Sequence, residues 1–125
     1  DSSQGQDLLE WALVGQEDWS GLATHAQELI ATDPTNADGH WILGTALDGQ
    51  EEWEELSAVM TAAVEVVEDP KNQARFLTRA GQASVRLQDY PSAVQHIRRS
   101  LALNPEQQDV RGYLQAVERA LARQR

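Results

Sequence analysis

Apolar residues recur every three or four positions along almost the whole chain. The first such runs comprise Leu9, Ala12, Leu13, Leu22, Ala26, Leu29 and Ile30. This spacing gathers the apolar side chains on one stripe of an α-helix. No stretch of useful length alternates apolar with polar residues, so no strand is predicted. The pattern predicts an all-α chain with helices near residues 4–15, 19–31, 37–48, 53–67, 72–87, 91–103 and 107–124.

The breaks between these helices carry turn residues. Gly15, Gly49 and Gln88 each stand shortly before an aromatic residue and are expected to end a helix. Asp-Pro or Asn-Pro pairs at 33–34, 69–70 and 104–105 are expected to end each segment, because proline restricts the backbone of the residue before it. Pro91 suits the first turn of a helix, where its missing N–H costs nothing.

The helices form an internal repeat. Trp19, Trp53 and Tyr90 each open the second helix of a unit, and they lie 34 and 37 residues apart. The period is close to 34 residues, with three extra residues in the second unit near 68–73. Repeats are predicted over about 3–36, 37–73 and 74–107, with a further helix over 108–124. Its apolar stripe suits the cap that a repeat array needs. That stripe consists of Val110, Leu114, Val117 and Leu121.

The third unit has small residues at Gly81 and Ala93, an apolar residue at Ile97 and a proline at Pro105. These positions are in register with the degenerate pattern of the tetratricopeptide repeat, which the unit resembles. The resemblance implies a right-handed α-solenoid of three antiparallel helix pairs plus one capping helix, seven helices in a single domain. Related helix-pair repeats with another period remain an alternative.

The first two units depart from the pattern. The second unit keeps Gly44 but has His40 at the tryptophan position and Leu56 at a small-residue position. The first unit has Glu10 in place of the glycine and Leu22 in place of the alanine. Large residues at small-residue positions are expected to open the helix pairs.

Composition excludes several classes of site. The chain of 125 residues has no cysteine, so disulfides, thiolate zinc sites and a cysteine nucleophile are ruled out. A net charge of −10 argues against nucleic acid as a partner. No apolar stretch is long enough to insert directly into a membrane. A start at Asp1 rather than methionine suggests a fragment or processed form of a longer chain, and no compartment is assigned.

The charges are unevenly distributed along the sequence. Residues 1–70 hold sixteen of the twenty Asp and Glu and no Lys or Arg, whereas residues 71–125 hold four acids and all ten bases. A high-GC or salt-adapted bacterial source accounts for an acidic, arginine-rich composition. It does not account for this polarity.

No catalytic constellation is found, so the chain is not expected to be an enzyme, and no metal or cofactor is predicted. His25, His40 and His96 are separated along the repeats, and a structural role is favoured for each. The carboxylates of Glu51, Glu52, Glu54 and Glu55 gather where a helix starts, which the helix dipole favours.

The resemblance implies a concave groove, lined by the first helix of each pair, that holds a peptide or helix of a partner protein. From the first two units the register predicts Asp7, Trp11, Val14, Asp38, Trp41, Thr45 and Asp48 in this groove. From the third unit it predicts Arg75, Thr78, Arg79, Gln82 and Arg86. The groove would be acidic and aromatic in one half and basic in the other.

The tryptophans have two interpretations. Trp41 lies off the packing stripe of its helix, so it is either a binding anchor or a filler of the neighbouring pair. Trp11 is either a similar anchor or buried against a preceding domain. Trp19, Trp53 and Tyr90 recur with the repeat and are assigned to the core.

Arg75 and Arg79, four residues apart, occupy places that hold a carboxylate in chaperone-binding relatives. The matching residues of the other two units are absent, so a complete carboxylate clamp is not expected. The alternative is that these arginines pair with the acidic second unit.

The leading functional hypothesis is a non-catalytic adaptor or scaffold that binds a partner protein. A second hypothesis is head-to-tail self-association, with the acidic half of one copy bound to the basic half of another. A third is a non-catalytic domain of a larger enzyme.

Overall fold

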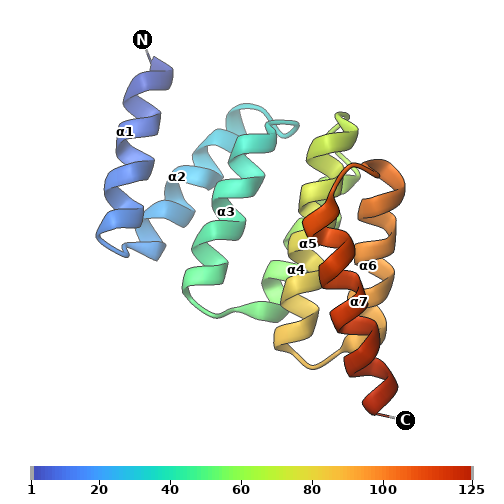
Figure 1. Ribbon diagram of the computed structural model, residues 1–125. Helices are drawn as coiled ribbons and strands as arrows, with labels where there is room; N and C mark the ends of the chain where they lie inside the picture. Colours follow the sequence, from blue (N-terminus) through green and yellow to red (C-terminus); the bar gives the residue numbers. More distant parts are fainter. Residues whose placement is uncertain (1, 125) are drawn as a thin grey trace. The chain divides into compact units, whose positions relative to one another are not determined.

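The computed structural model describes the backbone of residues 2–124 and the side chains of residues 9–124. This part of the chain contains seven α-helices and no strand (Figure 1). They are α1 (Ser2–Gly15), α2 (Trp19–Thr32), α3 (Ala37–Gly49), α4 (Trp53–Val64), α5 (Pro70–Arg86), α6 (Tyr90–Leu103) and α7 (Gln108–Arg123). The chain divides into two compact units, Asp1–Glu52 (unit 1) and Trp53–Arg125 (unit 2). The boundary falls between the two helices predicted for the second repeat.

The predicted helices are all present, and most bounds agree within two residues. The main difference is the end of α4, which stops at Val64 rather than at residue 67. The chain unwinds there because the N–H groups of Glu65 and Val66 bond three residues back instead of four. The amide of Gln73 donates to the carbonyls of Val64 and Val67, at 3.3 and 2.8 Å, and so satisfies the end of the helix.

The proline pairs do not all act alike. Asp69-Pro70 was expected to end a repeat, but it begins α5. The Asp69 side chain accepts a bond from the backbone N–H of Lys71, and Pro70 fills the first turn. Asp33 and Asn104 instead close short turns after α2 and α6. In each turn the side-chain oxygen accepts a hydrogen bond from the backbone N–H of the residue two positions later.

A left-handed residue ends the first helix of every predicted repeat. Among the described residues, Glu17, Glu51 and Gln88 are the non-glycine residues with positive φ, at 55, 58 and 60°. Each lies two positions before the aromatic that opens the next helix. The expected break is confirmed at these places. Gly15 and Gly49, however, are still helical, and the residue that turns the chain is not a glycine.

In unit 1, α2 and α3 share an apolar core around Leu22, Ala26, Ile42 and Ala46. Trp19 packs against this core, as predicted. A Cβ atom added to Gly49 would lie 2.3 Å from the Trp19 ring, so the ring rests directly on the backbone at the end of α3.

In unit 2, α5 and α6 approach closely at Gly81. A Cβ atom there would lie 2.7 Å from Cγ1 of Ile97, which is fully buried. The small residue of the repeat pattern is therefore required by contact between the two helices.

A buried hydroxyl joins α5, α6 and the turn that follows. Ser100 is fully buried and donates to the Ala74 carbonyl at 2.7 Å, while Thr78 lies 2.7 Å from its oxygen. Gln107, just before α7, donates to the Ser100 hydroxyl and carbonyl. The buried polar groups thus satisfy one another across three segments.

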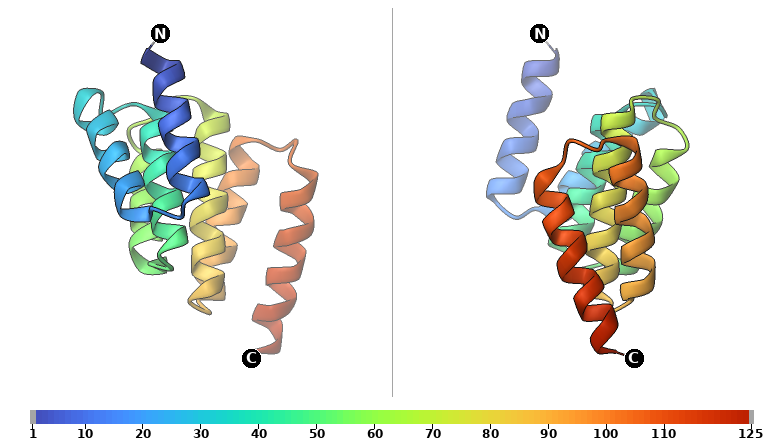
Figure 2. Two further views of the ribbon diagram at one scale, coloured as in Figure 1. Left: turned by 90° about the vertical axis from the view of Figure 1, so that its left-hand side faces the viewer. Right: turned by 45° about the vertical axis from the view of Figure 1, so that its right-hand side comes forward.

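The last helix covers one side of α6. In Figure 2, α7 (red) runs beside α6 (orange), and the two share a core. Val110 and Val117 are buried in it, while Leu114 and Leu121 pack at its margin. The predicted capping stripe is confirmed.

We expect Gly81→Ala to lower the free energy of unfolding by about 1–2 kcal/mol, because the added methyl group overpacks against Ile97. The matched control is Gly112→Ala on α7, where a Cβ meets nothing within 4 Å. That variant should gain about 1 kcal/mol from helix propensity. Urea unfolding followed by circular dichroism measures both. Equal effects of the two substitutions would contradict the close approach of α5 to α6.

Replacing a left-handed residue by glycine should stabilise the chain. Gln88→Gly is expected to raise the free energy of unfolding by about 0.5–1 kcal/mol, because glycine adopts a positive φ without a Cβ clash. The exposed control Gln95→Gly, inside α6, should lose about 1 kcal/mol. If both variants lose stability alike in the same unfolding measurement, the left-handed turn carries no strain.

Candidate partner-binding surfaces

The first-helix residues of unit 1 present an acidic surface with two tryptophans. Asp38 and Asp48 are exposed on α3, and Trp41 and Thr45 between them are half-buried. The Thr45 hydroxyl donates to the Trp41 carbonyl at 3.1 Å. Half-burial leaves part of the Trp41 side chain accessible, which suits either of the two roles predicted for it.

Trp11 on α1 is the most exposed large apolar side chain described, with 76% of its surface accessible. Val14, three residues on and on the same face, is 36% exposed. The opposite side of α1 packs on α2 through Leu13. Asp7, predicted beside Trp11, lies outside the residues whose side chains are described.

In unit 2 the corresponding surface is basic. Along α5, Gln82 and Arg86 are exposed, and Arg75 and Arg79 are half-buried. The helix carries one lysine and three arginines and no carboxylate. Thr78, expected with these residues, is half-buried as well, and its hydroxyl lies 2.7 Å from that of Ser100 within the helix pair, so its place in this surface stays a prediction.

Arg86 lies over an aromatic ring. Its guanidinium carbon is 5.2 Å from the centroid of Trp53, which is half-buried at the start of α4. This distance is that of a cation–π contact. Burial raises the pKa of the nearby Tyr113 hydroxyl on α7, and the positive charge of Arg86 partly opposes that rise. Tyr113 itself packs at the margin of the core that α6 and α7 share.

The charge difference between the units is large. Unit 1 contains eleven carboxylate side chains and no Lys or Arg, whereas unit 2 contains nine carboxylates and ten Lys or Arg. The residues predicted for the acidic half of the groove therefore lie in unit 1 and those predicted for its basic half in unit 2. That the two surfaces line one continuous groove stays a prediction.

The histidines occupy separate positions in the helices. The His40 ring lies 2.8 Å from the Pro34 carbonyl and ties the start of α3 to the preceding turn. His25 is buried in α2. Burial, with the nearby charge of Arg99, lowers the pKa of His96 on α6.

Two other classes of site are not found among the described residues. No group of three or more His, Asp or Glu side chains in residues 9–124 is placed to hold a metal ion. None of the described helices combines the length and the apolar character needed to span a membrane.

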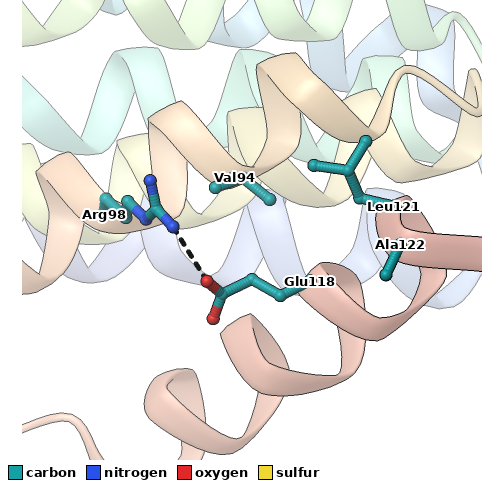
Figure 3. A pocket seen from close by; sticks show the side chains of 5 residues that line it. All are labelled: Val94, Arg98, Glu118, Leu121 and Ala122. Carbon is teal, nitrogen blue, oxygen red and sulfur yellow. Dashed lines mark hydrogen bonds and ion pairs between the residues drawn. The ribbon is translucent and has the colours of Figure 1, made fainter. Parts of the chain in front are cut away.

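An open pocket between α6 and α7 was not predicted. It has a volume of about 290 Å³ and is lined by Val94 and Arg98 of α6 and by Glu118, Leu121 and Ala122 of α7 (Figure 3). Arg98 and Glu118 form an ion pair at 2.8 Å across the gap between the helices (Figure 3). The sequence pattern placed Leu121 on the apolar stripe of the last helix. It did not indicate which side chains of α6 lie opposite that helix.

The fold was compared with known proteins. No protein-family model matches this sequence, and no curated protein sequence matches it. Solved structures do match. The N-terminal domain of stress-induced protein-1 (STI-1) from C. elegans has a TM-score of 0.81 and 24% identity, over 94% of this chain and 95% of that one. The OM64 TPR domain from Arabidopsis has a TM-score of 0.77 and 20% identity, over 94% of each chain.

A third similar structure is PcrH in complex with the chaperone binding region of PopD. Its TM-score is 0.79 at 18% identity, over 100% of this chain and 95% of that one. Each of the three structures matches this chain over nearly its whole length. The chain therefore has the tetratricopeptide-repeat fold, a solenoid of helix pairs.

Proposed function

We propose that this chain is a non-catalytic interaction module that binds a segment of a partner protein on the first helices of its repeats. The observation that carries the proposal is the contrast between two of these helices. α3 carries two carboxylates and no base, whereas α5 carries four bases and no carboxylate. A surface of this kind selects a partner by its order of charges.

The comparisons support binding in general. PcrH, which has the same fold, is described in complex with a region of PopD. Members of a repeat fold use extended surfaces of stacked helices to hold peptides. At 18% identity this likeness does not carry over a partner or a set of contacts.

The proposed surface consists of Trp11, Asp38, Trp41, Thr45, Asp48, Arg75, Arg79, Gln82 and Arg86. Trp41 and Trp11 would supply apolar anchors, since tryptophan is enriched among residues that dominate binding energy. The arginines of α5 would hold carboxylates of the partner, because a guanidinium can bond a carboxylate through two parallel N–H groups.

Arg86 is suited to this role by its contact with Trp53. A guanidinium stacked on a ring has already lost part of its rotational freedom. Less entropy is then lost when it bonds a partner carboxylate. Tyr113, whose hydroxyl is close enough to respond to the Arg86 charge, would extend the surface onto α7.

The proposal predicts that binding depends on the order of charges in the partner. Two labelled peptides of identical composition serve as probes, one with a Lys/Leu block before a Glu/Leu block and one with the blocks reversed. We expect one order to bind at least about tenfold more tightly in a fluorescence anisotropy titration, because only one direction pairs both blocks with opposite charge. Equal affinities for the two peptides would exclude a polarised surface.

The residues are tested with the peptide that binds better. Gln82→Glu, at an exposed position of α5, and Trp41→Ala should each weaken binding about tenfold. Arg79→Glu should do the same, with its thermal melting checked because Arg79 is half-buried. Arg123→Glu on α7 makes the same charge change outside the proposed surface and is the matched control. If it weakens binding as much as Arg79→Glu does, the assignment to α5 is wrong.

A further inference from the structure

The exposed apolar face of α1 requires an explanation that the fold does not supply. Trp11 and Val14 together form this α1 surface, and Trp11 leaves three-quarters of its side chain in water. Large exposed aromatic side chains are characteristic of protein contacts. Leu13, on the other side of the helix, already provides the packing against α2.

The charge around the α1 surface restricts what can cover it. Unit 1 has eleven carboxylates and no basic side chain. A symmetric contact between the α1 surfaces of two copies would bring two such units together, and like charges in an interface cost several kcal/mol. Charge complementarity therefore favours a basic surface as the one that covers α1.

The α6–α7 pocket has the complementary character. Its floor is apolar, formed by Val94, Leu121 and Ala122, and Arg98 and Glu118 lie at one side (Figure 3). At about 290 Å³ it is near the lower limit of ligand pockets, which suits one large side chain rather than a free metabolite.

The helices that form the pocket are basic. α6 and α7 together carry five arginines and only two carboxylates. The arginines are Arg98, Arg99, Arg111, Arg119 and Arg123, and all are exposed. Only Arg98 and Glu118 form an ion pair among the described residues of these two helices. The remaining positive charge is available to the solvent or to an acidic partner.

We propose that these two surfaces bind one another between copies of the chain. Trp11 of one copy enters the α6–α7 pocket of a second copy, and the acidic unit 1 faces the arginines of α6 and α7. The contact is heterologous, since it joins two different surfaces. Each copy keeps one surface unused, so the association continues into longer chains or closes into rings. This inference shares Trp11 with the surface proposed for a partner peptide but does not depend on the arginines of α5.

The association should depend strongly on salt. Between about 0.01 M and about 1 M ionic strength the Debye length falls from roughly 30 Å to roughly 3 Å. We expect the sedimentation coefficient of the wild-type chain to rise with concentration at low salt and to stay at the monomer value at high salt. A chain that is strictly monomeric at low salt and high concentration overturns the proposal.

Two variants block the two surfaces separately. Trp11→Ala removes the inserted side chain, and Ala122→Glu places a carboxylate in the pocket, where it repels unit 1. Each should weaken self-association at least about tenfold. Both positions are exposed, so circular dichroism should show an unchanged fold. Leu87→Ala, at a 40% exposed apolar position outside both surfaces, is the control and should associate as the wild type does.

A mixture of the two variants gives the decisive result. The Trp11→Ala chain keeps an intact pocket, and the Ala122→Glu chain keeps an intact α1, so the mixture should form a dimer that stops at two copies. Growth of the mixture into longer assemblies, or its failure to dimerise, contradicts the heterologous contact. Arg79→Glu should leave self-association unchanged, which separates this result from a failure of peptide binding.

Discussion

In the first two repeats the aromatic side chain that opens the second helix packs on the end of the following first helix, and this contact joins one repeat to the next. Trp19 lies on the backbone at Gly49, the last residue of α3. Trp53 lies beneath the guanidinium of Arg86, the last residue of α5. The residue that contacts the ring is a glycine in one case, so the backbone itself lies against the ring. In the other case it is an arginine, and its charged group lies over the ring. The contact survives a complete change of chemistry because a flat ring accepts either partner.

The residue at that position decides whether the contact is only structural or also presents a charged group to the surface. At residue 49 the ring of Trp19 rests on a glycine, which has no side chain that could bind another molecule. With arginine at residue 86, the ring orients a charged group that is still exposed. A position that only closes the core in unit 1 thus becomes part of a basic surface in unit 2.

The sequence predicted those parts of the fold that depend on local spacing. The Gly81, Ala93 and Ile97 positions identify a tight helix pair because only a small residue permits that approach. The end of α4 was misplaced because Val66 and Val67 continue the apolar run. The carbonyl of Val64 at the actual end of the helix accepts a hydrogen bond from the side-chain amide of Gln73, nine residues later, which no local pattern indicates.

The surfaces were less predictable than the helices. A residue such as Thr78 falls on the expected face by register, yet its hydroxyl is drawn to a serine 22 residues away. The α6–α7 pocket depends on which side chains two packed helices bring together, and no local pattern encodes that. Gln88 was expected to end a helix, but the positive φ at Glu17, Glu51 and Gln88 was not predicted, because these residue types do not favour it.

The longer second repeat has an evolutionary consequence. Its extra length lies mainly in α5, which has 17 residues where α3 has 13. The added residues stand at the start of α5, ahead of Gly81 and the other positions that pack on α6. A change of length at this end of the helix therefore leaves the packed face in phase. The other end of α5, where Arg86 lies over the Trp53 ring, does not have that freedom.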